Sequence, residues 1–488
     1  MLVARVRVMP RNRHSWPGYS VLAAAALAGC GPPAAAEETP ARQPAGWADE
    51  VQLPAVADLS ADPHVLEVQL EARLAELEVL PGIKTTLWTY NGGVPGPLLR
   101  GRVGDRLIVH FKNSLPEATS IHWHGLRISN EMDGVPDEPN PAVPPGGSFD
   151  YDFVLPDAGT YWYHPHYASA AQLGYGLYGP LIVDDPNEPA GLGDEVVLVL
   201  SDIGVEEGGR LVPGDGGGDF GTLFGREGNA MLVNGKLLPA LNVRRGVRQR
   251  WRLINAAKAR YFQLELGGTP FTRIGGDGGF LEAPEPLSRV LLTPAQRADV
   301  IVEPTPAAGE AELALKFVPY DRGTGTAFNR PIEDVLRLRF SDEPPASAPP
   351  LPPLAREIPV VDPSAARSVA ISLTVGMDAS GHLEMGINGV PSRNAEPVMA
   401  SLGERQLWTV ENTFEFDHPF HLHGYFFQVL DINGQAPARR EWRDTVNVPV
   451  NGSVRFVVDF DSRPGMWMFH CHILDHADAG MMGMVHVH

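Results

Sequence analysis

HVLEVQLEAR at residues 64–73 and DRLIVHFKNS at residues 105–114 alternate apolar and polar side chains along most of their length. Successive side chains of a β-strand point to opposite faces, so this period of two predicts strands with one buried side. SFDYDFVL at 148–155 repeats the pattern. The 52 glycines and 46 prolines supply the turns that separate such strands. No segment of convincing length has the helical period, so we expect an all-β fold.

The strand patterns recur in three blocks of similar size, which predicts three β-sandwich or barrel domains. DDPNEP at 184–189 and the Pro-rich stretch at 341–359 read as the linkers between them. Inside the second block, the Gly-rich and acidic residues 205–229 are expected to form a mobile loop. The predicted boundaries are a signal peptide at 1–29, a flexible tether at 30–60, domains at 61–186, 194–342 and 360–488, and a Pro-rich linker at 343–359.

The N-terminus has the pattern of an export signal. Four arginines and no acidic residue occupy positions 1–20, and the apolar run Val21–Ala28 follows, which is too short to span a bilayer. Leu27-Ala28-Gly29-Cys30 resembles a bacterial lipobox, which implies cleavage before Cys30 and acylation of its thiol. An ordinary signal peptide with an incidental cysteine is the alternative. We expect an exported protein, periplasmic or on the cell surface, that meets the membrane only through a lipid anchor.

Charge and cysteine content exclude other classes of protein. The net charge of −20 argues against nucleic-acid binding, which needs a basic face. The 488 residues contain two cysteines, Cys30 and Cys471, so a disulfide framework is excluded and at most one bridge is possible. A monomer whose stability comes from its β cores is expected.

The histidines are strongly clustered. Four short windows hold ten of the sixteen, and each window contains His-x-His. On a strand, such a pair presents two imidazoles on the same face. Burying so many imidazoles without a metal would leave many polar groups unsatisfied, so the clusters predict metal sites. The ten are His122, His124, His164, His166, His418, His421, His423, His470, His472 and His476.

Cys471 lies between two of these histidines. His470 and His472 would face one side of a strand and Cys471 the other, while His476 and Met481 follow at intervals of five residues. A thiolate, an imidazole and a weak thioether, completed by one more histidine, make the ligand set of a blue copper site. This tripeptide would therefore join two metal sites on opposite sides of one strand and carry electrons between them.

The motifs HWHG (122–125), HPH (164–166), HPFHLHG (418–424) and HCHILDHADAGMM (470–482) resemble those of the three-domain multicopper oxidases, the laccase-like enzymes. MLVNGK (231–236), RLINAA (252–257) and QRADVIVE (296–303) are similar to that family's middle domain. The resemblance covers nearly all of 61–488. It implies three cupredoxin-like Greek-key domains and four copper ions, one type 1, one type 2 and two type 3.

Carried over by position, the resemblance assigns His418, Cys471, His476 and axial Met481 to the type 1 copper. The type 2 copper takes His122 and His421. One type 3 copper takes His124, His164 and His472, and the other takes His166, His423 and His470. The first and third domains would meet at this cluster, with the middle domain as a spacer. Five histidines lie outside the four windows and are expected to be structural or solvent-facing: His64, His110, His382, His486 and His488.

The implied reaction is the oxidation of a reducing substrate in four one-electron steps, coupled to the reduction of dioxygen to water. Because this consumes protons, carboxylates near the cluster are needed. Asp133 and Asp475 match the family's positions, although relatives usually carry Glu at the latter. Asp444, in EWRDTV (441–446), is interpreted as a structural group or as one that supports the metal ligands from behind, and not as a catalytic residue.

The substrate is left open by the sequence. The methionines form no rich run of the kind found in cuprous oxidases, so a phenol-type, laccase-like substrate is favoured. Oxidation of Cu(I), Mn(II) or Fe(II) in metal homeostasis is the close alternative. A non-catalytic copper-binding or scaffold protein would be expected to lack ligands that are present here, and a copper nitrite reductase lacks the full set of four motifs.

Overall fold

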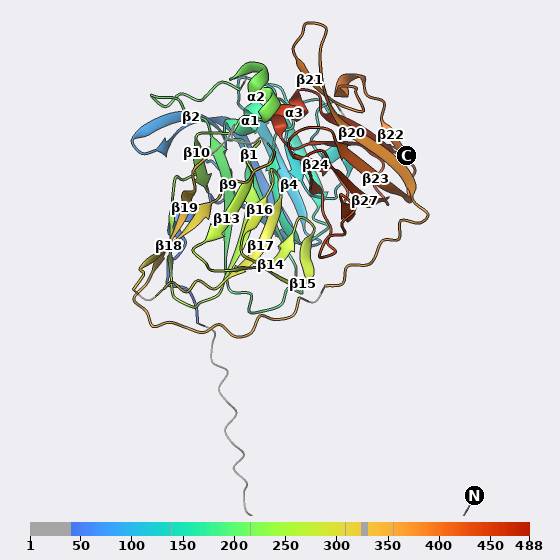
Figure 1. Ribbon diagram of the computed structural model, residues 1–488. Coiled ribbons are helices and arrows are strands. Elements are labelled where there is room, and N and C mark those ends of the chain that lie inside the picture. The colour runs from blue at the N-terminus through green and yellow to red at the C-terminus, as the bar shows by residue number, and fades with distance from the viewer. Residues whose placement is uncertain (1–40, 138, 215, 308, 324–329, 355) are drawn as a thin grey trace, which may run out of the picture. The chain divides into compact units, whose positions relative to one another are not determined.

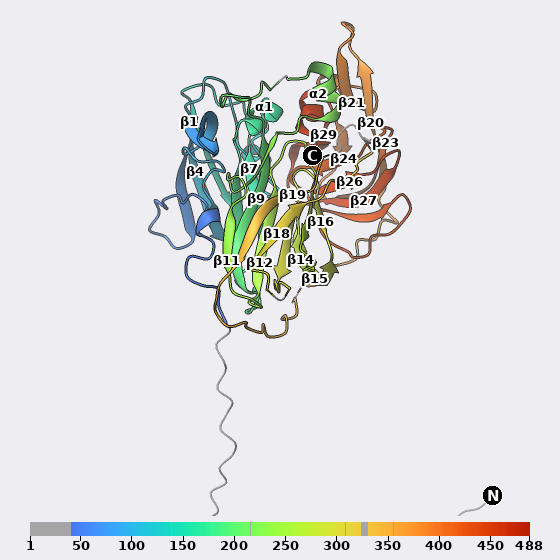
Figure 2. The ribbon, with the colours of Figure 1, turned by 60° about the vertical axis from the view of Figure 1, so that its left-hand side comes forward.

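The computed structural model describes residues 41–488, apart from 138, 215, 308, 324–329 and 355. The described residues form one compact unit. The described residues form six β-sheets and a few short helices, so the predicted all-β class is confirmed (Figures 1 and 2). The proposed signal peptide and Cys30 lie outside the described residues. Within the described part, no helix has the length and apolar character needed to cross a bilayer.

The alternating segments quoted above form the first pair of sheets. In β4 (Arg106–Asn113), Leu107, Val109 and Phe111 point inward and pack around the buried Trp123. One sheet has the order β2 (Ile83–Tyr90), β1 (Val65–Leu80), β4 and β6 (Ser148–Val154). The other has the order β3 (Leu99–Arg102), β8 (Gly179–Asp184), β7 (Gly159–His164) and β5 (His122–His124).

The second pair of sheets encloses a core around Trp251. One sheet has the order β10 (Ala230–Val233), β9 (Asp194–Ile203), β12 (Gln249–Asn255), β17 (Arg297–Val302), β14 (Phe271–Gly276) and β15 (Gly279–Leu287). The other has the order β11 (Ala240–Val243), β19 (Glu333–Phe340), β18 (Glu312–Phe317), β13 (Phe262–Leu266) and β16 (Val290–Leu292).

The third pair packs around Trp408. One sheet has the order β21 (Leu383–Ile387), β20 (Arg367–Met377), β23 (Glu404–Asn412), β27 (Ser453–Phe460) and β25 (Phe427–Ile432). The other has the order β22 (Val398–Ala400), β29 (Met482–Val487), β28 (Gly465–Cys471), β24 (His418–Leu422) and β26 (Thr445–Val448).

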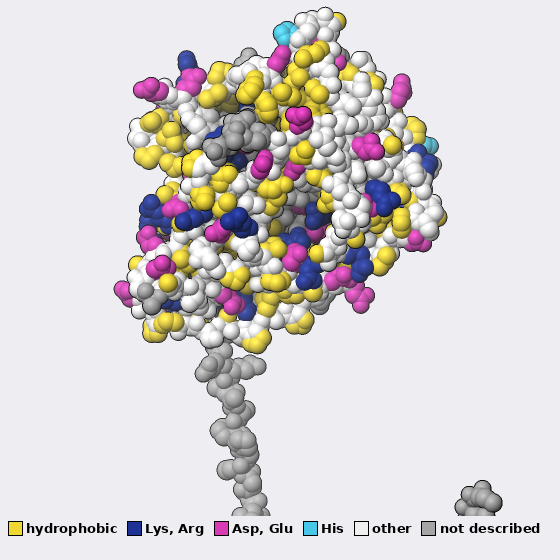
Figure 3. Space-filling model, viewed as in Figure 1, with side chains coloured by type: hydrophobic (Ala, Val, Ile, Leu, Met, Phe, Trp, Pro, Cys, Tyr) yellow, Lys and Arg dark blue, Asp and Glu magenta, His cyan; other side chains and the backbone are white. Residues whose placement is uncertain are grey.

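Three short α-helices gather at one end of the molecule (Figure 1). They are α1 (Ser169–Gly174), α2 (Gly218–Phe224) and α3 (Leu474–Asp478), and both α1 and α2 contact α3. Helix α2 lies within the segment for which the sequence predicted only a loop. Single 3₁₀ turns occur at Asp49–Val51, Asn130–Met132 and Ser392–Asn394. On the face shown in Figure 3, acidic and basic side chains are interspersed.

Candidate metal centres

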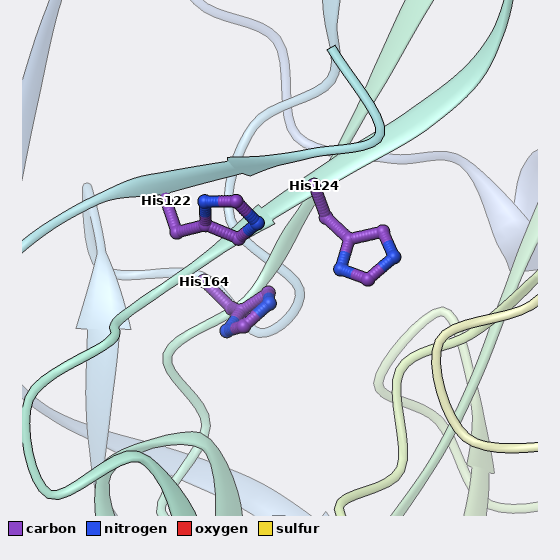
Figure 4. A group of neighbouring side chains, drawn as sticks. All are labelled: His122, His124 and His164. Carbon is purple, nitrogen blue, oxygen red and sulfur yellow. The ribbon is translucent and has the colours of Figure 1, made fainter. Parts of the chain in front are cut away.

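Strands β5 and β7 place the histidines of the first pair of sheets. His122 and His124 are two residues apart on β5, and their side chains are buried. His164 ends β7 directly opposite His122 in the antiparallel register. Figure 4 shows the three imidazoles gathered around a common space. Their ligand nitrogens lie within 4.8 Å of one another, close enough to bind the same metal ion or neighbouring ones.

Strands β24 and β28 place the histidines of the third pair of sheets. His421 lies opposite His470, and Phe420 lies opposite Cys471. Because side chains alternate along a strand, His470 faces the histidines of β5 and β7 while Cys471 points away from them. The strand register therefore puts His470 and Cys471 on opposite sides of β28, as predicted, whereas the binding of metal on each side stays a prediction.

Eight histidines meet between the two sets of strands. His470 Nε2 lies 3.2 Å from His423 Nε2 and 3.4 Å from His166 Nε2. The His472 ring lies 5.1 Å from that of His124. Three groups of nitrogens come within 4.8 Å of one another: His122, His124 and His164; His122, His421 and His423; and His166, His423 and His470.

The hydrogen bonds of these imidazoles leave lone pairs directed at the shared space. Nδ1 of His122, His164 and His421 contacts the carbonyl oxygens of Asp133, Pro165 and Asp444 at 2.9–3.0 Å. A carbonyl only accepts, so each Nδ1 carries the proton and each Nε2 is left as an acceptor. Those three Nε2 atoms are buried and have no partner among the described residues. Buried imidazole lone pairs without donors fit a cluster of metal ions.

Burial also sets the charge of these rings. It lowers the pKa of His164, His470 and His472 well below the ordinary value of histidine, and the neighbouring imidazoles act in the same direction. The rings are therefore neutral at physiological pH. Neutral imidazole is the form that binds a metal ion.

A second group lies on the other side of β28. The Sγ atom of Cys471 is 3.4 Å from His418 Nδ1 and 3.5 Å from His476 Nδ1, and these two nitrogens are 3.2 Å apart. Met481 is fully buried, and its backbone N–H donates to the carbonyl of His476 at 2.9 Å. Burial raises the pKa of the Cys471 thiol to about 12, so a thiolate here needs a cation to hold it. The donor set of this group fits copper.

Carboxylates support the histidine cluster. Asp133 Oδ2 lies 2.8 Å from His423 Nδ1, and its Oδ1 lies 3.3 Å from His122 Nδ1. Asp475 has a different environment: its oxygens accept from the backbone N–H of Arg226 at 2.7 Å and from its guanidinium at 2.5 Å. The relay role of Asp475 stays a prediction, whereas its observed contacts hold α3 to a segment of the middle block.

Asp444 was not among the sequence-predicted catalytic residues, yet it lies at the cluster. Its Oδ1 is 3.3 Å from His124 Nε2 and 3.5 Å from His421 Nδ1. The guanidinium of Arg297, on β17, donates to both of its oxygens at 2.9 and 2.5 Å. The middle block thus supplies a charged side chain that orients the surroundings of the cluster, which goes beyond the predicted role of a spacer.

Comparisons with known proteins agree with this geometry. Three family models described as multicopper oxidase match residues 72–188, 196–311 and 363–488. This chain belongs to the multicopper oxidase family. The multicopper oxidase MmcO of Mycobacterium tuberculosis is 32% identical, with 96% of this chain and 95% of that protein aligned.

Two solved multicopper oxidases share the fold. The Campylobacter jejuni protein, described as a metallo-oxidase, has a TM-score of 0.79 at 30% identity and covers 89% of this chain and 94% of its own. A laccase from Pediococcus acidilactici has a TM-score of 0.77 at 30% identity and covers 90% and 93%. The cupredoxin-like architecture is thereby confirmed. A multicopper oxidase is a copper-dependent oxidoreductase that uses dioxygen and a reducing substrate, with four coppers as its standard complement.

Proposed function

We propose that His418, Cys471, His476 and Met481 hold the type 1 copper of this multicopper oxidase, and that the eight other clustered histidines hold the trinuclear cluster. The observation that carries the proposal is a convergence on both sides of β28. On one side lie buried imidazole nitrogens without a hydrogen-bond partner among the described residues, and on the other lies a buried thiol with two imidazoles. Copper bound there would supply one-electron oxidation of the reductant and reduction of dioxygen.

The remaining contributions come from the chain itself. Cys471 and its neighbours His470 and His472 give a continuous covalent path from one centre to the other. The strands around both centres exclude water, since Cys471, His418 and His472 are fully buried. We assign to Asp133, which contacts His423 and His122, the role of holding those rings and passing protons toward the cluster.

A compact reductant is the proposed substrate. The Nε2–H of His476 donates to the carbonyl oxygen of Leu223 at 3.0 Å, and the His476 side chain is fully buried. A small phenol therefore fits the approach better than a bulky one. The contact of Leu223 with His476 also favours a second candidate substrate, a metal ion such as Cu(I), Fe(II) or Mn(II). Relatives carry both descriptions, laccase and metallo-oxidase.

Oxygen uptake by the copper-loaded protein tests the proposal, with catechol, Cu(I), Fe(II) and Mn(II) supplied side by side. Uptake with at least one of them is expected. A Cys471→Ser variant should consume no oxygen with any of them, whereas Met468→Leu on the same strand should behave as the parent protein. Full turnover by Cys471→Ser would rule out the assigned electron path.

The cellular setting is also a proposal. The predicted signal peptide and lipobox support an exported protein anchored at Cys30. We further propose that the chain acts as a monomer, with domain boundaries at 61–186, 194–342 and 360–488. Each predicted domain contains one of the three pairs of sheets.

A further inference from the structure

Residues 216–226 of the middle block lie across the type 1 site. Leu223 accepts the hydrogen bond from His476 Nε2, and the ring of Phe224 lies 5.8 Å from that of Phe416, which itself is 5.9 Å from the His476 ring. At Gly225 a Cβ atom would lie 2.6 Å from the side chain of Ile473, so the backbone rests directly against the chain that follows Cys471. Both ribbon views show α2 beside α3 (Figures 1 and 2).

This segment has little of its own to hold it in place. Five of its residues are glycines, and ordering glycine costs more backbone entropy than ordering any other residue. No residue of α2 is buried, and Phe220 is 63% exposed. Leu223 and Phe224 are half-buried against the core of the third pair of sheets, but the glycines and Phe220 add little buried apolar surface. A segment with few buried apolar contacts belongs to the easily opened part of a fold. Its position over His476 therefore depends on polar contacts as well as on the packing of these two side chains.

Arg226 makes most of those polar contacts, beside a hydrogen bond that the Arg322 guanidinium donates to the carbonyl oxygen of Phe224. Its guanidinium donates to Asp475 Oδ1 at 2.5 Å, and its backbone N–H donates to Asp475 Oδ2 at 2.7 Å. The same guanidinium reaches back to the carbonyls of Gly216 and Gly218, at 2.6 and 3.0 Å, and to Thr222 Oγ1 at 3.1 Å. One side chain thus closes the turn and fastens it to α3, the helix that carries His476. The Asp475 side chain is fully buried, so solvent screens this ion pair little.

We propose that Arg226 is a specificity-determining positioning residue, which holds α2 over His476 and so excludes large organic reductants from the type 1 site. The inference rests on the proposed function of that site. It assigns the selection of substrate by size to an ion pair between the middle block and α3, and not to the copper ligands themselves.

Arg226→Gln tests this role, and Arg210→Gln is the matched control. Arg210 lies in the same Gly-rich region but pairs with Glu206 on the surface, with 81% of its side chain exposed. Hydrogen exchange of residues 216–226 should accelerate in Arg226→Gln and stay unchanged in Arg210→Gln. The ratio of kcat/KM for syringaldazine, a large phenol, to that for catechol should rise by about tenfold or more, mainly through KM, because a charge-assisted hydrogen bond to a buried group is lost.

The outcomes separate this inference from the proposed function. An unchanged ratio would overturn it, even if exchange became faster, because the covering would then not select the substrate. Arg226→Lys keeps the charge beside Asp475 but loses the fork to Gly216 and Gly218, so its ratio should lie between those of the parent and Arg226→Gln. It provides the test if Arg226→Gln fails to fold. Failure of the proposed function would appear differently, as absence of oxygen uptake by the parent protein with every reductant.

Discussion

Replacing Asp444 by Asn should destabilise the protein far more than an equivalent change on the surface. Arg297 and Asp444 are both buried, with 0% and 2% of their side chains exposed. Removing one partner of such a pair leaves an uncompensated buried charge, which typically costs about 3–5 kcal/mol. Asp277 Oδ1 lies 3.4 Å from Arg297 and takes up part of that charge, so we expect the lower end, about 3 kcal/mol.

Urea unfolding of the copper-free protein measures this loss, because bound copper would add its own stabilisation. Asp459→Asn is the control. Asp459 pairs with Arg405 through two hydrogen bonds, but 41% and 38% of the two side chains are exposed, so at most about 1 kcal/mol should be lost. Equal losses of unfolding free energy in the two variants would refute the argument that the buried Arg297–Asp444 pair stabilises the contact between the middle and third blocks.

Two further predictions concern charge near the centres. The buried guanidinium of Arg322 lies over the ring of Phe416, which stacks on His418. Because a nearby positive charge favours the reduced copper, Arg322→Gln should lower the reduction potential of the type 1 copper in a redox titration. An unchanged potential would contradict this. Burial raises the pKa of Asp277 to about 7, and the negative charge of Asp444 acts in the same direction. The positive charges of Arg297 and Arg443 oppose this rise. The folded state then holds a proton that the unfolded chain releases, so stability should fall as pH rises from about 4 to 7. Asp277→Asn should flatten this part of the thermal-stability profile, and an identical slope in both proteins would show that another group titrates.

The sequence predicted well which candidate ligands share a strand face, because that information is local. His-x-His on a strand places two imidazoles on one face whatever the rest of the fold does, and Cys471 between His470 and His472 must point the other way. The all-β class followed from the same period of two. These features require only the geometry of a single strand.

Contacts between the three blocks could not be predicted from such local patterns. Asp444 and Arg297 are 147 residues apart in sequence, and neither sits in a pattern that reveals the other. The covering of His476 depends on Arg226 meeting Asp475 across 249 residues. Residues 205–229 have the composition of a loop, and contacts with α3, Arg322 and Phe416, all distant in sequence, hold residues 218–224 in place.

The claim that two copper centres share the His470-Cys471-His472 tripeptide is tested most directly by the copper content and spectra of Cys471→Ser. The parent protein should bind four coppers and show the intense visible band of a Cu(II)–thiolate. The variant should lose that band and one copper, while the electron paramagnetic resonance signal of the type 2 copper remains, because its proposed ligands His122 and His421 are untouched. A visible band that survives in Cys471→Ser would contradict the account.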